Sequence, residues 1–150
     1  MQSATDALKF RHFLNCRIRR VRRIFYVHRG DIDKTNGPIE LSFDERAPIT
    51  FDSGSNGQDL AVGPAWVDPF AEPLSAENRA FVEECGKWTA FDVSDEPLYR
   101  DLVGATVRDV SVSSTARGAV VARIVASAAT ISLDPDGDEM TVVIEPSSDR

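Results

Sequence analysis

The sequence predicts an α+β fold with about eight mostly antiparallel strands and three short helices. Three observations support this fold class. Apolar and polar residues alternate along short segments, turn-forming residues separate these segments, and two stretches of the chain contain the same order of elements. Short alternating segments joined by tight turns are typical of hairpins, whereas parallel strands need long helical crossovers.

The composition is that of one folded domain spanning residues 1–150. Hydrophobic residues make up 42% and charged residues 27% of the chain, which a globular domain divides between a core and a surface. No apolar run approaches the roughly 20 residues that cross a bilayer. Met1–Phe10 also lacks the apolar stretch of a signal peptide. We therefore expect a cytoplasmic protein without a membrane partner.

Six segments are clear candidates for strands. The longest, Arg17–His28, also fits helical spacing, but it is rich in β-branched and aromatic residues and has a counterpart later in the chain. The other five alternate with period two, which predicts one buried face for each strand. They are Ile39–Phe43, Ile49–Phe51, Leu60–Val62, Ile131–Leu133 and Met140–Ile144.

Capping residues predict three helices. Serine or aspartate precedes each helix, where a side-chain oxygen can accept a hydrogen bond from a free backbone N–H. Asparagine or glycine follows each one, because these residues tolerate the left-handed conformation that ends a helix. The helices are Ala4–Leu14 before Asn15, Ala76–Cys85 before Gly86, and Glu96–Val103 before Gly104.

The two parts of the chain that flank the second helix are similar in pattern, which predicts an internal duplication. Aligned without a gap, Asn15 matches Gly104 and Ile18 matches Val107. After a contraction, residues 49–52 match residues 131–134, and after another, 60–62 match 140–142. Each half would contain a helix, a left-handed stop, a long strand and three shorter strands.

This duplication sets the expected organisation of the domain. The repeat halves cover about residues 4–62 and 95–145, and residues 63–93 form a helical connector between them. We expect the halves to be pseudo-symmetric and to form either a β-sandwich or one curved sheet or open barrel. The connector is expected to pack its helix over an open face of the sheet.

The second half resembles a unit found in small uncharacterised bacterial proteins. The pattern Leu-x-Gly-x-x-Val-x-x-Val spans residues 102–110, and Asp-Gly-Asp-Glu-Met-x-Val spans residues 136–142. In those proteins a similar unit sometimes occurs twice. The resemblance covers most of residues 98–145 and, more loosely, residues 10–62. It implies a related arrangement of strands and turns, with no known activity, and it transfers no functional residue.

Two sets of residues invite a metal-binding interpretation that their spacing does not support. Asp134, Asp136 and Asp138 begin like a calcium loop, but Glu139 stands where an EF-hand needs its turn glycine. His12, Cys16, His28 and Cys85 lack the paired spacing of a zinc site. We predict no metal, no cofactor and no catalytic residue, with both histidines at the surface or its boundary and both cysteines as buried thiols.

The charge is distributed unevenly along the chain. Residues 1–30 contain eight basic residues and one acidic residue, a net charge of +7, whereas residues 31–150 contain nine and 23, a net charge of −14. The arginines of Arg17–Arg23 could form a nucleic-acid strip. We favour a structural role, because the acidic remainder of the chain would repel a polyanion and supplies partners for these arginines.

Three classes of function remain open. The first is a non-catalytic protein-interaction module, such as an immunity-like or antitoxin-like protein that binds a basic partner protein through charge complementarity. The second is a small-ligand binder or an enzyme with a pocket at the connector. The third is nucleic-acid binding through Arg17–Arg23. The sequence is also compatible with a homodimer. We expect Trp88 to be buried and Trp66 to be partly exposed. The connector residues that we propose for the pocket are Trp66, Asp68, Phe70, Trp88 and Asp92.

Overall fold

A computed structural model describes residues 10–53, 60–114, 116, 120–136 and 139–147. The described chain is mostly antiparallel β-structure with one α-helix, so the predicted fold class is confirmed at that level. Ten strands are present in this part of the chain. In chain order the elements are η1 Phe10–Phe13, β1 Ile18–His28, β2 Asp31–Asp33, β3 Ile39–Phe43, β4 Ile49–Ser53, β5 Leu60–Gly63, α2 Ala76–Cys85, β6 Lys87–Asp92, β7 Val107–Ser114, β8 Val120–Ala126, β9 Ala129–Asp136 and β10 Glu139–Pro146.

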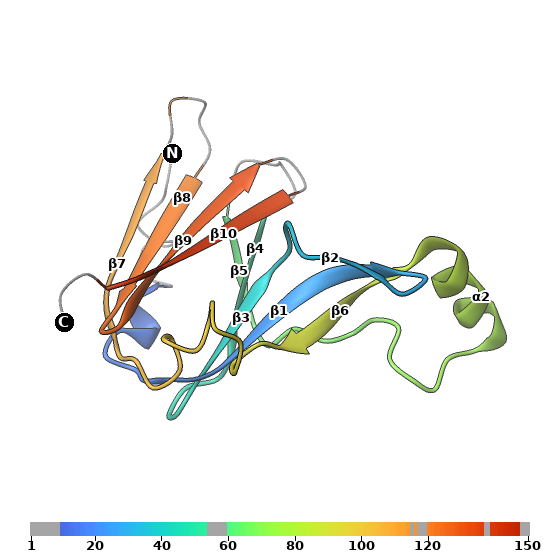
Figure 1. Cartoon of the computed structure of the whole chain (residues 1–150), viewed down its shortest axis with the longest axis horizontal. Coiled ribbons are helices and arrows are strands. Elements are labelled where there is room, and N and C mark those ends of the chain that lie inside the picture. Colours follow the sequence, from blue (N-terminus) through green and yellow to red (C-terminus); the bar gives the residue numbers. More distant parts are fainter. Residues whose placement is uncertain (1–9, 54–59, 115, 117–119, 137–138, 148–150) are drawn as a thin grey trace.

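The strands form two sheets. The six-stranded sheet has the order β2-β1-β3-β4-β5, with β6 paired to β1, and the four-stranded sheet has the order β10-β9-β8-β7. Figure 1 shows the two sheets facing each other at one end of the molecule, while β1, β2, β6 and α2 extend away from them as an arm. The long strand β1 therefore connects the two-sheet body to the arm.

The hydrophobic core lies between the two sheets. Phe13 from η1 stacks on Phe43, with ring centroids 5.4 Å apart, and meets Phe51 edge-on at 5.9 Å. These aromatic contacts hold η1 against the six-stranded sheet. Fully buried aliphatic residues from both sheets complete the core: Ile18, Val21, Ile39, Leu41, Val107, Ile124, Ile131 and Leu133.

The strands β1-β3-β4-β5 and β7-β8-β9-β10 have the same order and matching registers. The pairing of β1 with β3 shifts after Ile18, and the pairing of β7 with β8 shifts after Val107. Further along, Ile49 pairs with Leu41 as Ile131 pairs with Ile124. These positions are the ones that the sequence alignment pairs.

Reciprocal backbone hydrogen bonds join the two sets of strands where each begins. Asn15 and Gly104 both adopt left-handed backbone conformations, with φ of 66° and 87°. The Asn15 N–H donates to the Val107 carbonyl at 2.8 Å, and the Gly104 N–H donates to the Ile18 carbonyl at 2.7 Å. An antiparallel bridge between Arg17 and Thr106 lies at the centre of this exchange.

The structure corrects the number of helices. The segment predicted as a helix over Glu96–Val103 is a series of turns, with hydrogen bonds from Tyr99 N–H to Glu96 and from Leu102 N–H to Tyr99, each 2.9 Å long. Tyr99 and Leu102 are both buried and three residues apart, a spacing that tight three-residue turns place on one side. Of the helix predicted over Ala4–Leu14, residues 4–9 lie outside the described residues, and the rest contains only η1.

The helix α2 has the predicted bounds but not the predicted role. The Ser75 side chain accepts a hydrogen bond from the Asn78 N–H, and Gly86 ends the helix with φ 79°. However, none of the helix residues is buried, and Figure 1 places α2 at the tip of the arm. The helix therefore does not cover a sheet face. None of the helices in the described ranges has the length and apolar character required to span a membrane.

Candidate functional site

The site lies on the outer face of the six-stranded sheet, opposite the core. Its foundation is a buried ion pair between neighbouring strands. Arg22 donates two hydrogen bonds to the Glu40 carboxylate, 2.7 Å to Oε1 and 2.6 Å to Oε2. Arg20 lies 3.7 Å from the same carboxylate, whose side chain is completely buried.

The same ion pair fixes the main chain of the connector. The Trp66 N–H donates to Glu40 Oε2 at 2.8 Å, and its carbonyl accepts from Arg22 at 3.1 Å. Burial alone would raise the pKa of Glu40, but the hydrogen bonds from Arg22 and Trp66 and the charges of Arg22 and Arg20 hold it below its usual value. Glu40 is therefore ionised at neutral pH and anchors Trp66.

A buried arginine fixes the turn beside β3. Arg23 is 3% exposed, and its guanidinium donates to the Tyr99 hydroxyl at 2.8 Å. It also donates to the carbonyls of Gly37 at 3.1 Å and Pro38 at 3.3 Å. Burial lowers the pKa of Arg23, and the interactions with Tyr99 partly oppose this. The turn at Gly37 and Pro38 is thereby tied to β1.

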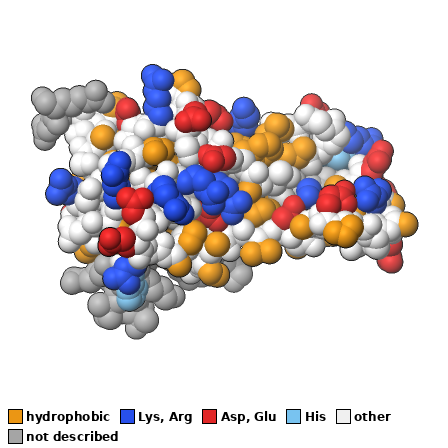
Figure 2. All heavy atoms as spheres, turned by 90° about the horizontal axis from the view of Figure 1, so that it is seen from below, with side chains coloured by type: hydrophobic (Ala, Val, Ile, Leu, Met, Phe, Trp, Pro, Cys, Tyr) orange, Lys and Arg blue, Asp and Glu red, His pale blue; other side chains and the backbone are white. Residues whose placement is uncertain are grey.

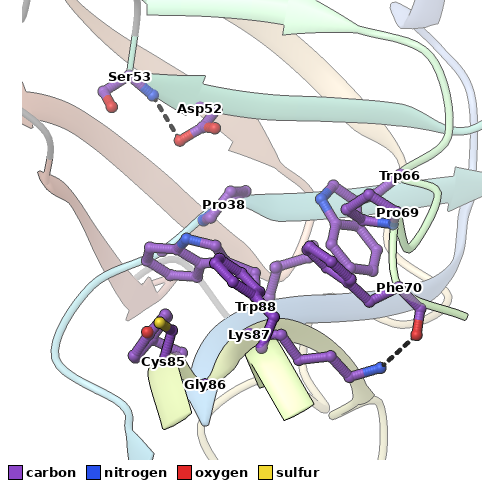
Figure 3. Close-up of a pocket in the computed structure, with 14 residues that line it drawn as sticks. Pro38, Asp52, Ser53, Trp66, Pro69, Phe70, Cys85, Gly86, Lys87 and Trp88 are labelled. Atoms are coloured by element: carbon purple, nitrogen blue, oxygen red, sulfur yellow. Dashed lines mark hydrogen bonds between the residues drawn. The ribbon is translucent and has the colours of Figure 1, made fainter. Parts of the chain in front are cut away.

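Aromatic side chains surround a pocket of about 680 Å³ above this face (Figure 3). One comes from β1 and four come from the connector, including its helix α2 and its strand β6, and four of the five form two pairs. The Phe70 and Phe81 rings are stacked with centroids 5.5 Å apart, and Tyr26 meets Trp88 edge-on at 5.4 Å. The lining residues are Ile24, Tyr26, Gly37, Pro38, Asp52, Ser53, Trp66, Pro69, Phe70, Phe81, Cys85, Gly86, Lys87 and Trp88.

Two glycines allow the backbone to pass close to these rings. A Cβ on Gly37, which has φ 138°, would lie 2.0 Å from the Ile24 carbonyl oxygen and 3.3 Å from the Trp88 ring. A Cβ on Gly86 would lie 2.6 Å from the Val27 carbonyl oxygen and 3.0 Å from the Tyr26 hydroxyl. Any larger residue would displace the backbone at either position.

A second ion pair holds the connector loop. Lys87 Nζ lies 2.6 Å from Asp68 Oδ2 and donates to the Phe70 carbonyl at 3.2 Å. Burial would raise the pKa of Asp68, but the hydrogen bonds from Lys87 and the Phe70 N–H and the Lys87 charge lower it overall. The Lys87 amine therefore interacts with groups of the pocket wall rather than with the cavity. Figure 3 shows this amine directed at the Phe70 carbonyl.

Asp52 is the acidic residue among those that line the pocket. Its Oδ1 accepts a hydrogen bond from the Ser53 N–H at 2.8 Å. Burial raises the pKa of Asp52, and the hydrogen bond from Ser53 only partly opposes this effect. Across the described ranges, no basic side chain forms an ion pair with Asp52. The carboxylate is thus partly desolvated without a compensating charge from the described residues.

Replacing Asp52 with asparagine is expected to raise the free energy of unfolding at neutral pH, by less than about 1 kcal/mol. A raised folded pKa means that ionised Asp52 destabilises the folded state. The gain should be fully present above this pKa and disappear as the pH falls through the ordinary value of 3.8. Urea denaturation of both proteins between pH 3 and 8 would measure it. A lower stability of the variant at pH 7 would contradict the prediction.

The structure brings together three of the five proposed connector residues. Trp66, Phe70 and Trp88 line the pocket, and Asp68 contributes indirectly through Lys87. Asp92 does not line it: it is paired with Arg22 across β6 and β1, further along the same face. Sequence reasoning missed several lining residues that lie outside the connector. These are Ile24, Tyr26, Gly37, Pro38, Asp52 and Ser53.

Two burial predictions are wrong. Trp88 is 38% exposed rather than buried, because its ring projects from the outer face of the arm, while Trp66 is partly exposed as predicted. Both cysteines are free, but Cys85 is exposed at the end of α2 and Cys16 is only partly buried. The arm is narrow, so its outward-facing residues have no second layer to cover them.

The arginines of Arg17–Arg23 mostly have partners within the chain. Arg17 lies 4.0 Å from Asp44, Arg20 and Arg22 share Glu40, and Arg23 is bonded to neutral groups in the core. Figure 2 shows Lys and Arg side chains interspersed with Asp and Glu on the face that it displays. This geometry supports the structural role that we favour for the arginines. Nucleic-acid binding stays untested.

Comparisons with known proteins give no further guide. No protein-family model, curated protein or solved structure matches this chain. The resemblance to small bacterial proteins with a repeated unit therefore stays a prediction. Within the described ranges, no three His, Cys, Asp or Glu residues are grouped so that they could hold a metal ion.

Proposed function

We propose that this protein is a non-catalytic binding module that holds a small ligand in the aromatic pocket. One observation carries the proposal: five aromatic side chains, one from β1 and four from the connector, converge on a cavity of about 680 Å³. Ligand sites of this size are typically lined by apolar and aromatic groups with a few polar groups that orient the ligand. The five are Tyr26, Trp66, Phe70, Phe81 and Trp88.

The exposure of these residues supports a binding role over a purely structural one. Phe81 is 49% exposed, Trp88 is 38% exposed, and the nearby Val67 is 78% exposed. Exposed apolar residues that gather in one region commonly mark a site of interaction. Hydrogen bonds to the Trp66 N–H and to the Phe70 carbonyl hold this region in place without burying it.

A protein partner is the second candidate. The helix α2 buries none of its residues, so a partner protein could cover α2 and the rim of the pocket. The version in which a basic partner binds an acidic surface finds less support, because the face in Figure 2 carries mixed charges.

We also propose that the two matching sets of strands are copies of one repeat, covering about residues 4–62 and 95–145. Their shared register and the reciprocal hydrogen bonds at Asn15 and Gly104 support this. Under this proposal the connector makes the halves unequal. Asp52 on β4 corresponds to Asp134 on β9, but only Asp52 lines the aromatic pocket.

Replacing Trp88 with alanine is expected to abolish binding of the probe 4-tert-butylphenol, whose flat apolar body suits the pocket. The loss of stability should stay well below the about 3–5 kcal/mol of a fully buried tryptophan, because the side chain is 38% exposed. Isothermal titration calorimetry and urea denaturation would measure the two effects.

Phe91→Ala is the matched control, because Phe91 lies on the opposite face of β6 and packs on Phe25. This variant should lose stability and retain the probe affinity of the unmodified protein. Equal probe binding by the unmodified protein and Trp88→Ala would contradict the proposed site. No binding of the probe to the unmodified protein at millimolar concentration would do the same.

A further inference from the structure

The charges that line the aromatic pocket do not balance. Lys87 and Asp52 are its charged residues among those described. The charge of Lys87 is neutralised by Asp68 at 2.6 Å, and its amine also donates a hydrogen bond to the Phe70 carbonyl. Asp52 has no such partner in the described part of the chain, where its carboxylate accepts a hydrogen bond from the Ser53 N–H. An ionised Asp52 therefore leaves the pocket with a net negative charge.

The surrounding rings add to the same electrostatic preference. The face of an aromatic ring carries partial negative charge and attracts cations, with tryptophan the strongest. Trp66 and Trp88 both line the pocket, together with Tyr26, Phe70 and Phe81. Figure 3 shows the Trp66 and Trp88 side chains on opposite sides of the cavity, with Asp52 beyond Pro38.

We propose that the pocket takes an organic cation, a substituted ammonium whose charge faces Asp52 and whose alkyl or aryl groups contact Trp66 and Trp88. This inference deepens the proposed function and rests on it.

Other classes of ligand fit these observations less well. An anion would meet the unpaired carboxylate of Asp52 and the negative faces of the rings. A bare magnesium or calcium ion needs about six oxygen ligands or more, whereas Asp52 is the lining residue that offers a carboxylate. An alkylated ammonium has few N–H donors and a large apolar surface, so rings and one carboxylate suffice for it.

The state of Asp52 agrees with this assignment. Burial without a cationic partner raises its pKa, so the ionised carboxylate is held in an unfavourable environment. A bound cation would remove part of that penalty by pairing with the carboxylate. Affinity for a permanently charged ammonium should therefore fall as acid protonates Asp52.

Two isosteric probes and one anion of similar size test the charge preference: (4-hydroxyphenyl)trimethylammonium, neutral 4-tert-butylphenol and anionic 4-tert-butylbenzoate. Calorimetric titration of the full chain at pH 7 should show the cation binding about tenfold more tightly than the neutral probe, and the anion more weakly than either. Asp52→Asn should remove most of the preference for the cation while retaining the neutral probe. Asp134→Asn, at the corresponding position of β9, should change neither affinity.

The outcomes separate this inference from the proposed function. If all three probes bind equally well, the ligand class is wrong while the pocket remains a binding site. If Asp52→Asn keeps the full preference for the cation, the charge does not face Asp52 and this inference fails. If no probe binds, both proposals fail. If the preference for the cation requires Asp52 and declines at acid pH, the assignment holds.

Discussion

Replacing Glu40 with alanine should lower the free energy of unfolding by about 3 kcal/mol. The carboxylate is fully buried and accepts hydrogen bonds from Arg22 and the Trp66 N–H. Its removal leaves a largely buried guanidinium and a backbone donor without their acceptor. Urea denaturation at pH 7 would measure the loss. Glu45→Ala, at an exposed position, should stay within about 0.5 kcal/mol of the unmodified protein.

The stabilisation by Glu40 has a defined dependence on pH. Its pKa in the folded protein is below the ordinary value of 4.5, so the ionised form stabilises the fold. This contribution is fully present above pH 4.5 and is lost as the pH falls through the lower folded pKa. The stability of Glu40→Gln should therefore approach that of the unmodified protein in acid. A constant difference from pH 7 to pH 2 would show that the charge of Glu40 is unimportant.

Arg23→Met is expected to lower the free energy of unfolding by about 3 kcal/mol. Methionine fills much of the volume but leaves the Gly37 and Pro38 carbonyls and the Tyr99 hydroxyl without the donor that they share. The Pro38 carbonyl keeps the Ile24 N–H as a donor at 3.0 Å, but all three acceptors lose Arg23 in a region where it is only 3% exposed. The turn at Gly37 and Pro38 should also loosen, so probe binding in the pocket should weaken.

An exposed arginine on the same strand provides the control for Arg23. Arg19→Met should change stability by less than about 0.5 kcal/mol, because Arg19 faces solvent. Arg23→Lys keeps the charge but replaces a planar fork of donors with a single amine. An intermediate loss is expected for it. If Arg23→Met were as stable as the unmodified protein, the three hydrogen bonds would contribute nothing net.

Five of the six segments that the sequence identified as strands alternate apolar and polar residues, and the sixth, Arg17–His28, was identified by its composition and its counterpart. Ile39–Phe43 and Met140–Ile144 alternate in sequence because one face meets the other sheet, and both were found, although all five residues of Ile39–Phe43 are buried in the structure. The strand β6 was missed because it lies on the arm, where neither face has a second sheet to select apolar residues. The strand β2 is three exposed residues long and carries no such pattern.

The site was only partly predictable for a related reason. The connector stood out by its tryptophans, and Trp66 and Trp88 do line the pocket. Asp52 lies in a segment with an ordinary strand pattern, and only the folding of the connector over β4 makes it a pocket residue. The burial of Glu40 and Arg23 likewise depends on tertiary contacts, which the alternation of apolar and polar residues in the sequence does not predict.

The helix α2 supplies Phe81 and Cys85 to the pocket although none of its residues is buried. Its unfolding would expose little additional apolar surface, so the helix can open at far lower free energy than the two sheets. Its amide protons should exchange with solvent much faster than those of β1 and β8. The measured affinity of the pocket for a ligand then includes the free energy required to keep α2 folded against the pocket. A ligand that contacts Phe81 should slow exchange at the tip of the arm while the core amides keep their rates.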